Sequence, residues 1–161
     1  MENTGQVPAP FPNMNRLDDI LVLTPQFSPI EARLTVLTSV RSPDSELLPA
    51  REKPALRVAG WVNGPLCEYA ETLRQRTSLK QESPSTESKA FRSQALILEP
   101  CFWEPEHPFC YELAIELYEG SEIRDRRRML IVIRHLQVRG RQLLFNGKPY
   151  FVQGTRRSSP A

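Results

Sequence analysis

The sequence has little of several features that would point directly to a class of protein. Three of its 161 residues are cysteine and two are histidine. Three cysteines cannot all pair with one another and no Cys-x-x-Cys spacing occurs, so neither a disulfide framework nor a zinc ribbon is indicated. We expect Cys67, Cys101 and Cys110 to be reduced, partly buried thiols, and we expect no metal and no cofactor.

Long apolar runs and an excess of one charge are also missing. No stretch is apolar for long enough to cross a bilayer, and 21 basic against 19 acidic residues leave a net charge of +2. A charge this close to neutral favours neither nucleic acid nor a membrane surface as a partner. The first 15 residues lack the basic and apolar regions of a secretory signal, so the chain as written is expected to be cytoplasmic.

What the sequence does contain is a series of short apolar stretches between proline-containing loops. Its 15 prolines, against seven glycines, suit short strands and loops more than helices. Alternating or β-branched patterns predict strands over residues 19–24, 31–40, 55–62, 90–98, 109–118 and 129–138. Pro25 is expected to end the first of these strands, and Asn63-Gly64-Pro65 to form a turn after the third. In the fifth strand, one face carries Tyr111, Leu113, Ile115 and Leu117.

Residues 66–81 fit two different structures. One is a helix with an apolar stripe through Leu66, Tyr69, Ala70 and Leu73. The other is a pair of short strands. Strands are favoured because the flanking pattern is all-β.

The clearest turn signal lies near the C-terminus, where Asn146-Gly147 separates two apolar runs within residues 143–152. Both residue types tolerate positive φ, which a two-residue hairpin turn requires. The sequence therefore predicts a β-hairpin here. Its apolar segment 150–152 either folds back on the domain or stays exposed, and exposure would favour association with another chain.

An ordered set of motifs surrounds this hairpin. Trp-x-Pro-Glu-x-Pro is followed by Tyr-x-Leu, an arginine on a strand, Asn-Gly-Lys-Pro and a closing glycine. The set resembles the family 2 glycoside hydrolases, which include β-galactosidases, β-glucuronidases and β-mannosidases. Val132 departs from the pattern, since the family usually has a glycine at that position. The matching residues are Trp103, Pro105, Glu106, Pro108, Tyr111, Leu113, Asp125, Arg134, Asn146, Gly147, Lys148, Pro149 and Gly154.

The resemblance implies that this run spans the end of an immunoglobulin-like sandwich and the hairpin that leads into a catalytic (β/α)8 barrel. We therefore expect an all-β fold: an immunoglobulin-like β-sandwich of about seven strands with a C-terminal β-hairpin extension. The expected parts are a flexible lead-in (1–15), the sandwich (16–139), the hairpin resembling a barrel entry (140–154) and a disordered tail (155–161).

The chain ends seven residues after Gly154, so we expect the barrel and its two catalytic carboxylates to be absent. The expected function is a non-catalytic accessory or scaffold domain from a truncated or split glycosidase, linked to carbohydrate metabolism. Its expected partners are a separately encoded barrel or a second copy bound through the hairpin. The alternative is a stand-alone carbohydrate-binding or protein-interaction module.

Other candidate residues have simpler interpretations. Glu104 and Glu106 lie two apart in a proline-rich connection, which favours loop closure, so no catalytic residue is assigned. His107 lies between two cysteines without the spacing of a zinc site. His135 is expected on a strand, facing solvent or capping a neighbour. The run 126–128, all arginine, is interpreted as a solvated turn rather than a phosphate-binding patch.

Two tryptophans are candidates for stacking on a sugar ring. Trp103 lies in the proline-rich connection and Trp61 in an apolar strand. For Trp61, packing in the core is the more usual fate.

Overall fold

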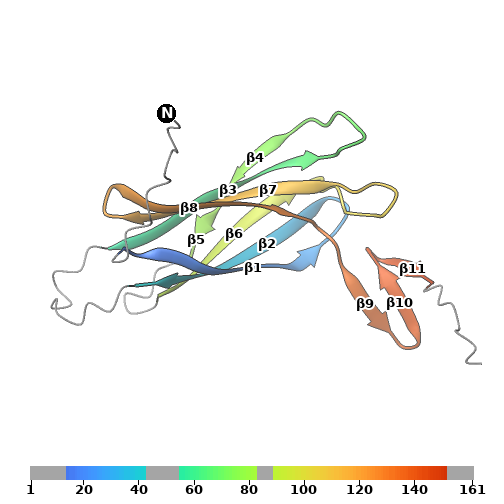
Figure 1. Cartoon of the computed structure of the whole chain (residues 1–161). Coiled ribbons are helices and arrows are strands. Elements are labelled where there is room, and N and C mark those ends of the chain that lie inside the picture. Colours follow the sequence, from blue (N-terminus) through green and yellow to red (C-terminus); the bar gives the residue numbers. More distant parts are fainter. Residues whose placement is uncertain (1–13, 43–54, 83–88, 152–161) are drawn as a thin grey trace, which may run out of the picture.

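The computed structural model describes residues 14–42, 55–82 and 89–151, and no helix occurs among them. Two four-stranded antiparallel sheets face each other as a sandwich, and a three-stranded sheet extends from one end (Figure 1). The all-β sandwich with a C-terminal hairpin is therefore confirmed. The predicted lead-in up to residue 13, Val152, Gly154 and the tail 155–161 lie outside the described residues.

The strands follow three hydrogen-bonded orders: β1-β2-β6-β5, β4-β3-β7-β8 and β11-β10-β9. The first sheet contains β1 (Arg16–Phe27), β2 (Glu31–Arg41), β6 (Ala90–Leu98) and β5 (Lys80–Gln81). The second contains β4 (Gln75–Ser78), β3 (Leu56–Leu66), β7 (Cys110–Glu119) and β8 (Glu122–Ile131). The small third sheet contains β11 (Lys148–Tyr150), β10 (Gln142–Phe145) and β9 (Leu136–Arg139).

The core lies between the two large sheets, where every second residue of a strand points inward. On β2 the inward residues are Ala32, Leu34, Val36, Thr38 and Val40, each 4% exposed or less. The predicted inward face of β7 is confirmed: Tyr111, Leu113, Ile115 and Leu117 are at most 2% exposed. The period of two read from the sequence thus identifies the centre of the fold.

Two predicted strand ends are wrong. β1 continues past Pro25 to Phe27, with an irregular register between Leu23 and Gln26. Proline is tolerated there because β1 is an edge strand, so a missing N–H breaks no bond to a second neighbour. β3 likewise runs through Gly64-Pro65 to Leu66, with its register to β7 shifted after Asn63.

Within residues 66–81 the chain forms two short strands, β4 and β5, as favoured from the sequence, although both lie in its second half. β4 pairs with β3 in the second sheet, whereas β5 pairs with β6 in the first. Between them, the backbone N–H of Leu79 donates to the carbonyl of Gly60 at 2.8 Å. The chain therefore crosses from one sheet to the other at a single residue. The alternative helix does not form, and Tyr69 and Leu73 are largely exposed.

The arginine run is not a turn, because residues 126–128 lie within β8. The turn comes earlier, at Gly120-Ser121, where Gly120 has φ +62°. Arg127 donates to the carbonyls of Leu17 and Asp18 on β1, and Asp125 Oδ2 accepts the N–H of Leu17 at 2.8 Å. These contacts join the edge strands of the two sheets. Charged side chains on an edge strand also hinder pairing with another chain, which explains why β8 carries a run of arginines.

The predicted strand 129–138 is two strands in different sheets. β8 ends at Ile131, and β9 begins at Leu136 and pairs with β10. Residues 136–139, which were assigned to the sandwich, therefore pair within the small sheet. The break at 132–135 is hard to see in the sequence because apolar residues on both sides of it suit a strand in either sheet.

Candidate functional site at the junction

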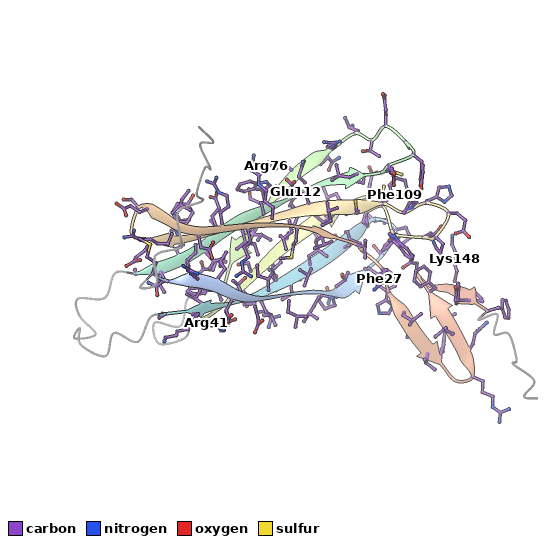
Figure 2. The ribbon with its side chains drawn as sticks, in the orientation of Figure 1. Phe27, Arg41, Arg76, Phe109, Glu112 and Lys148 are labelled. Atoms are coloured by element: carbon purple, nitrogen blue, oxygen red, sulfur yellow. The ribbon has the colours of Figure 1, made fainter. Side chains whose placement is uncertain are left out.

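The junction is the contact between the connection 101–109 and the segment 133–148. It brings together four residues of the predicted motif set: Trp103, Arg134, Asn146 and Lys148. They come from the connection after β6, the segment between β8 and β9, and the turn and strand that follow β10. Figure 2 shows Phe27 and Lys148 at this end of the molecule.

Asn146 is the centre of the junction. It has φ +51° and is followed by Gly147 with φ +79°, so the predicted two-residue turn is present. The backbone N–H of Asn146 donates to the carbonyl of His135 at 2.8 Å. Its Oδ1 accepts the His135 N–H at 2.9 Å, and its Nδ2 donates to the carbonyl of Trp103 at 3.0 Å. One side chain thus ties the hairpin turn to two separate segments.

Trp103 is held in place by a backbone hydrogen bond and by contacts of its ring. Its N–H donates to the carbonyl of Ile133 at 2.9 Å. Its ring meets Phe145 edge to face, with centroids 6.1 Å apart at 84°. The Arg134 guanidinium lies 5.8 Å from the Trp103 ring centroid. The ring is therefore a packing element between the connection and β10.

Glu104 closes the loop that the sequence analysis proposed. Its N–H and carbonyl exchange hydrogen bonds with those of His107, each 3.0 Å long. Its carboxylate lies 3.8 Å from Lys148 Nζ and 3.9 Å from His107 Nδ1. Pro105, Glu106 and His107 are exposed. Ion pairs this exposed contribute about 1 kcal/mol at most, so they orient the loop more than they stabilise it.

An aromatic cluster from three elements underlies the junction. Phe27, at the end of β1, packs against His135 in a tilted arrangement with centroids 4.4 Å apart and meets Phe102 edge to face at 5.6 Å. His135 is half-buried between β8 and β9 rather than on a strand. Its Nδ1 is buried and has no hydrogen-bond partner among the described residues. Sequence reasoning missed Phe27, because nothing local relates it to the hairpin.

Tyr111 supports the connection from inside the sandwich. It is 2% exposed, and its hydroxyl accepts the N–H of Cys101 at 2.8 Å. Burial raises the pKa of Tyr111 to about 12, while the Cys101 hydrogen bond acts in the opposite direction. Burial also raises the pKa of the Cys101 thiol. Cys67, Cys101 and Cys110 are all partly buried, as predicted. Pro108 is partly buried, while Pro149 is exposed on β11.

Trp61 is not in the core. It lies on the outer face of β3, because the inward positions are the even-numbered ones from Val58 to Gly64. The Arg76 guanidinium covers its ring at 3.9 Å from the centroid. No ring contact joins Trp61 to Trp103, so the structure does not bring the two sugar-stacking candidates together.

The described residues contain no group of three or more His, Cys, Asp or Glu side chains that could hold a metal ion. Nor do residues 14–42, 55–82 or 89–151 include a helix that could cross a membrane.

Neither a protein-family model nor a curated protein matches the sequence. Solved structures do. A β-glucuronidase from Bifidobacterium dentium, complexed with coumarin-3-O-glucuronide, matches 87% of this chain with a TM-score of 0.60 and 20% identity. A Bacteroides uniformis β-glucuronidase matches 84% with a TM-score of 0.59 and 24% identity. A glycosyl hydrolase family 2 member from Bacteroides cellulosilyticus matches 84% with a TM-score of 0.56 and 15% identity.

The fold is that of a region within family 2 glycosidases. The resemblance predicted from the motifs is therefore confirmed at the level of the fold. Sequence identities of 15–24% show similarity of fold only. The chain spans only 21%, 16% and 16% of the lengths of these three enzymes.

Proposed function

We propose that this chain is a non-catalytic sandwich domain that holds its three-stranded sheet in a fixed orientation for a further domain or chain. The observation that carries the proposal is the Asn146 network. That one residue bonds to Trp103 of the connection and to His135 of the segment entering β9. A flexible linker would need no such fixation. The similarity to part of larger glycosidases supports the same role.

The small sheet carries an apolar face that a partner would cover. Cross-strand pairing puts one set of residues on the same side of the sheet. The set consists of Leu136, Val138, Leu143, Phe145, Lys148 and Tyr150, and Lys148 is its one charged member. Leu136 is 62% exposed, Val138 71% and Tyr150 46%. An exposed apolar sheet face of this kind is typical of an interaction surface.

The carboxylates of the connection support a structural role. Glu104 contacts Lys148 and His107, and Glu106 is exposed on the same tight turn. Glycoside hydrolysis uses two carboxyl groups that face each other across the scissile bond. Two positions on one tight turn, two residues apart, do not provide that arrangement.

A carbohydrate-binding role has weaker support. Trp103 already contacts Phe145 and Arg134, and Arg76 covers the Trp61 ring. Sugar stacking would require one of these rings to lose its present neighbour.

Activity assays test the non-catalytic part of the proposal. The purified chain is incubated with nitrophenyl galactoside, glucuronide and mannoside, and no turnover is expected. Turnover that disappears in Glu104→Gln or Glu106→Gln, while the variant stays folded, would contradict the proposal.

The orienting role is tested with Asn146→Asp. This variant keeps an acceptor for the His135 N–H but replaces the Nδ2 donor to Trp103 with a second oxygen. We expect a loss of about 1–3 kcal/mol, seen as faster amide hydrogen exchange in β9, β10 and β11 while β7 stays protected. Asn63→Asp on the outer face of β3 is the matched control. Equal effects of the two variants, or no effect of Asn146→Asp on the small sheet, would contradict an orienting role.

A further inference from the structure

A cavity of about 350 Å³ lies at the same end of the sandwich. It is formed between the loop that joins β3 to β4 and the ends of β6 and β7. It is partly enclosed. Its volume is within the range of small-molecule sites, which is about 300–1,000 Å³. It shares Cys101 and Phe109 with the connection 101–109 and Tyr111 with the motif set, while the rest of its lining lies outside both.

The charged groups of the cavity are of one sign. Glu71 and Glu99 line it, and its lining contains no lysine, arginine or histidine. Within the described residues, neither carboxylate forms an ion pair. Two unpaired carboxylates around one partly enclosed space create a negative potential, which favours a cationic ligand.

The rest of the lining is mainly apolar and aromatic. Its aromatic residues are Phe109, which is partly buried, and Tyr111, which is 2% exposed. Phe109 is therefore the aromatic residue available to a ligand, and an aromatic ring attracts an ammonium ion that lies against its face. Leu73 and Leu98 also line the cavity, although they are 85% and 57% exposed. Large apolar side chains left exposed beside a cavity are suited to cover the apolar body of a ligand.

Several backbone and side-chain contacts hold this lining in place. The N–H of Glu99 donates to the carbonyl of Ile30 at 2.7 Å, and Glu99 has φ +48°, a conformation that is uncommon outside glycine. The Thr72 hydroxyl donates to the carbonyl of Pro65, which fixes the loop between β3 and β4. The backbone of Glu99 and that of Thr72, the neighbour of Glu71, are thus held in place, and both glutamate side chains are exposed.

We propose that this cavity binds a small organic ammonium ion with an apolar body. The carboxylates of Glu71 and Glu99 hold the charged nitrogen, and Phe109, Leu73 and Leu98 cover the apolar part. This site is separate from the apolar face of the small sheet, and it does not depend on the scaffold role.

The test uses 2-phenylethylamine as the probe, followed by backbone amide chemical shifts of the full chain. Saturable shifts are expected around Glu71, Glu99 and Phe109, and not in β9, β10 or β11. Two compounds with the same phenylethyl body isolate the charge: 2-phenylethanol is neutral, and 3-phenylpropionate is anionic. The amine should bind at least about tenfold more tightly than either. Equal binding of all three would overturn the proposal.

Variants locate the site. Glu71→Gln combined with Glu99→Gln should weaken amine binding by about tenfold or more, with little change in thermal stability. Glu122→Gln is the matched control, since this exposed carboxylate lies at the opposite end of β7 and should leave binding unchanged. Leu73→Lys is a second variant at a highly exposed position, and its added cation should also weaken binding. Unchanged binding in both cavity variants, or equal loss with Glu122→Gln, would overturn the proposal.

Discussion

Tyr111 connects the core of the sandwich to the loop that carries the junction. Its ring is fully enclosed, while its hydroxyl reaches the backbone N–H of Cys101, ten residues earlier. A buried tyrosine needs such a partner, since an unpaired hydroxyl in the core is costly. The contact therefore fixes where the connection 101–109 leaves the first sheet.

Tyr111 should make the stability of the protein fall at high pH. Its folded-state pKa is raised from 10 to about 12, mainly by burial. Below pH 10 both states keep the proton, and between pH 10 and 12 the unfolded state alone loses it. Stability is therefore lost as pH rises through this window, by roughly 1–3 kcal/mol. Urea unfolding at pH 9 and pH 11 measures the change.

Tyr111→Phe separates this effect from other titrations. The variant should lose about 1–2 kcal/mol at pH 9, because the Cys101 N–H loses its acceptor. Its further loss up to pH 11 should be smaller than that of the native chain. An identical pH dependence in both proteins would show that another group is responsible.

At this scale, sequence reasoning succeeded where one local rule decides the outcome. Strand alternation placed Tyr111 inward, and the positive φ of Asn146 followed from turn chemistry. The side-chain bonds of Asn146 could not be predicted, because its partners lie 11 and 43 residues away. Trp61 was assigned to the core from its apolar surroundings, although the alternation of its own strand points it outward.

At the scale of elements, the pairing of β3 with β7 depends on Gly60. A Cβ added there would lie 2.2 Å from the carbonyl oxygen of Ala114 and 2.9 Å from Leu79 Cδ1. The oxygen belongs to the backbone of the neighbouring strand, so it cannot move without disturbing the ladder. This glycine allows two central strands to pair inside the second sheet.

Gly60→Ala should therefore destabilise the protein by about 2–4 kcal/mol, measured by chemical denaturation. Gly120→Asn is the control. A side chain at Gly120 meets no atom within 4 Å, and asparagine tolerates its positive φ. Its loss should stay below about 1 kcal/mol. If Gly60→Ala left the free energy of unfolding unchanged, β3 and β7 would be able to move apart without loss of stability, which would contradict this prediction.

Most strands could be predicted from their patterns, and those of β2, β6 and β7 agree closely with the structure. The ends of β1, β3 and β8 could not. The proline in β1 predicts the end of a strand, and the arginines in β8 predict a turn. Both residue types are compatible with these strands because β1 and β8 lie at sheet edges. Edge position is a property of the sheet, which local sequence does not encode.

At the scale of the whole molecule, the apolar face of the small sheet should govern association. Val138 is 71% exposed on β9. Val138→Lys should abolish any concentration-dependent rise in mass seen by size-exclusion chromatography with light scattering. Leu130→Lys is the matched control, since Leu130 is 67% exposed on β8 and lies outside this face. A chain that stays monomeric at high concentration would count against self-association and leave a different partner for the face.

The motif set could predict the sandwich and its hairpin, because spaced motifs carry information about fold that single strands lack. The cavity could not be predicted from the sequence. Glu71 and Glu99 are 28 residues apart, and both line the cavity because the loop before β4 and the residues after β6 lie on its walls.

The single-residue crossing at Leu79 has a mechanical consequence. β4 and β5 belong to opposite sheets and are joined by Leu79 alone. A shift of either sheet by one residue would therefore force the other sheet to move with it. The two layers should therefore melt together rather than one after the other, and thermal unfolding followed separately through each layer should trace a single curve.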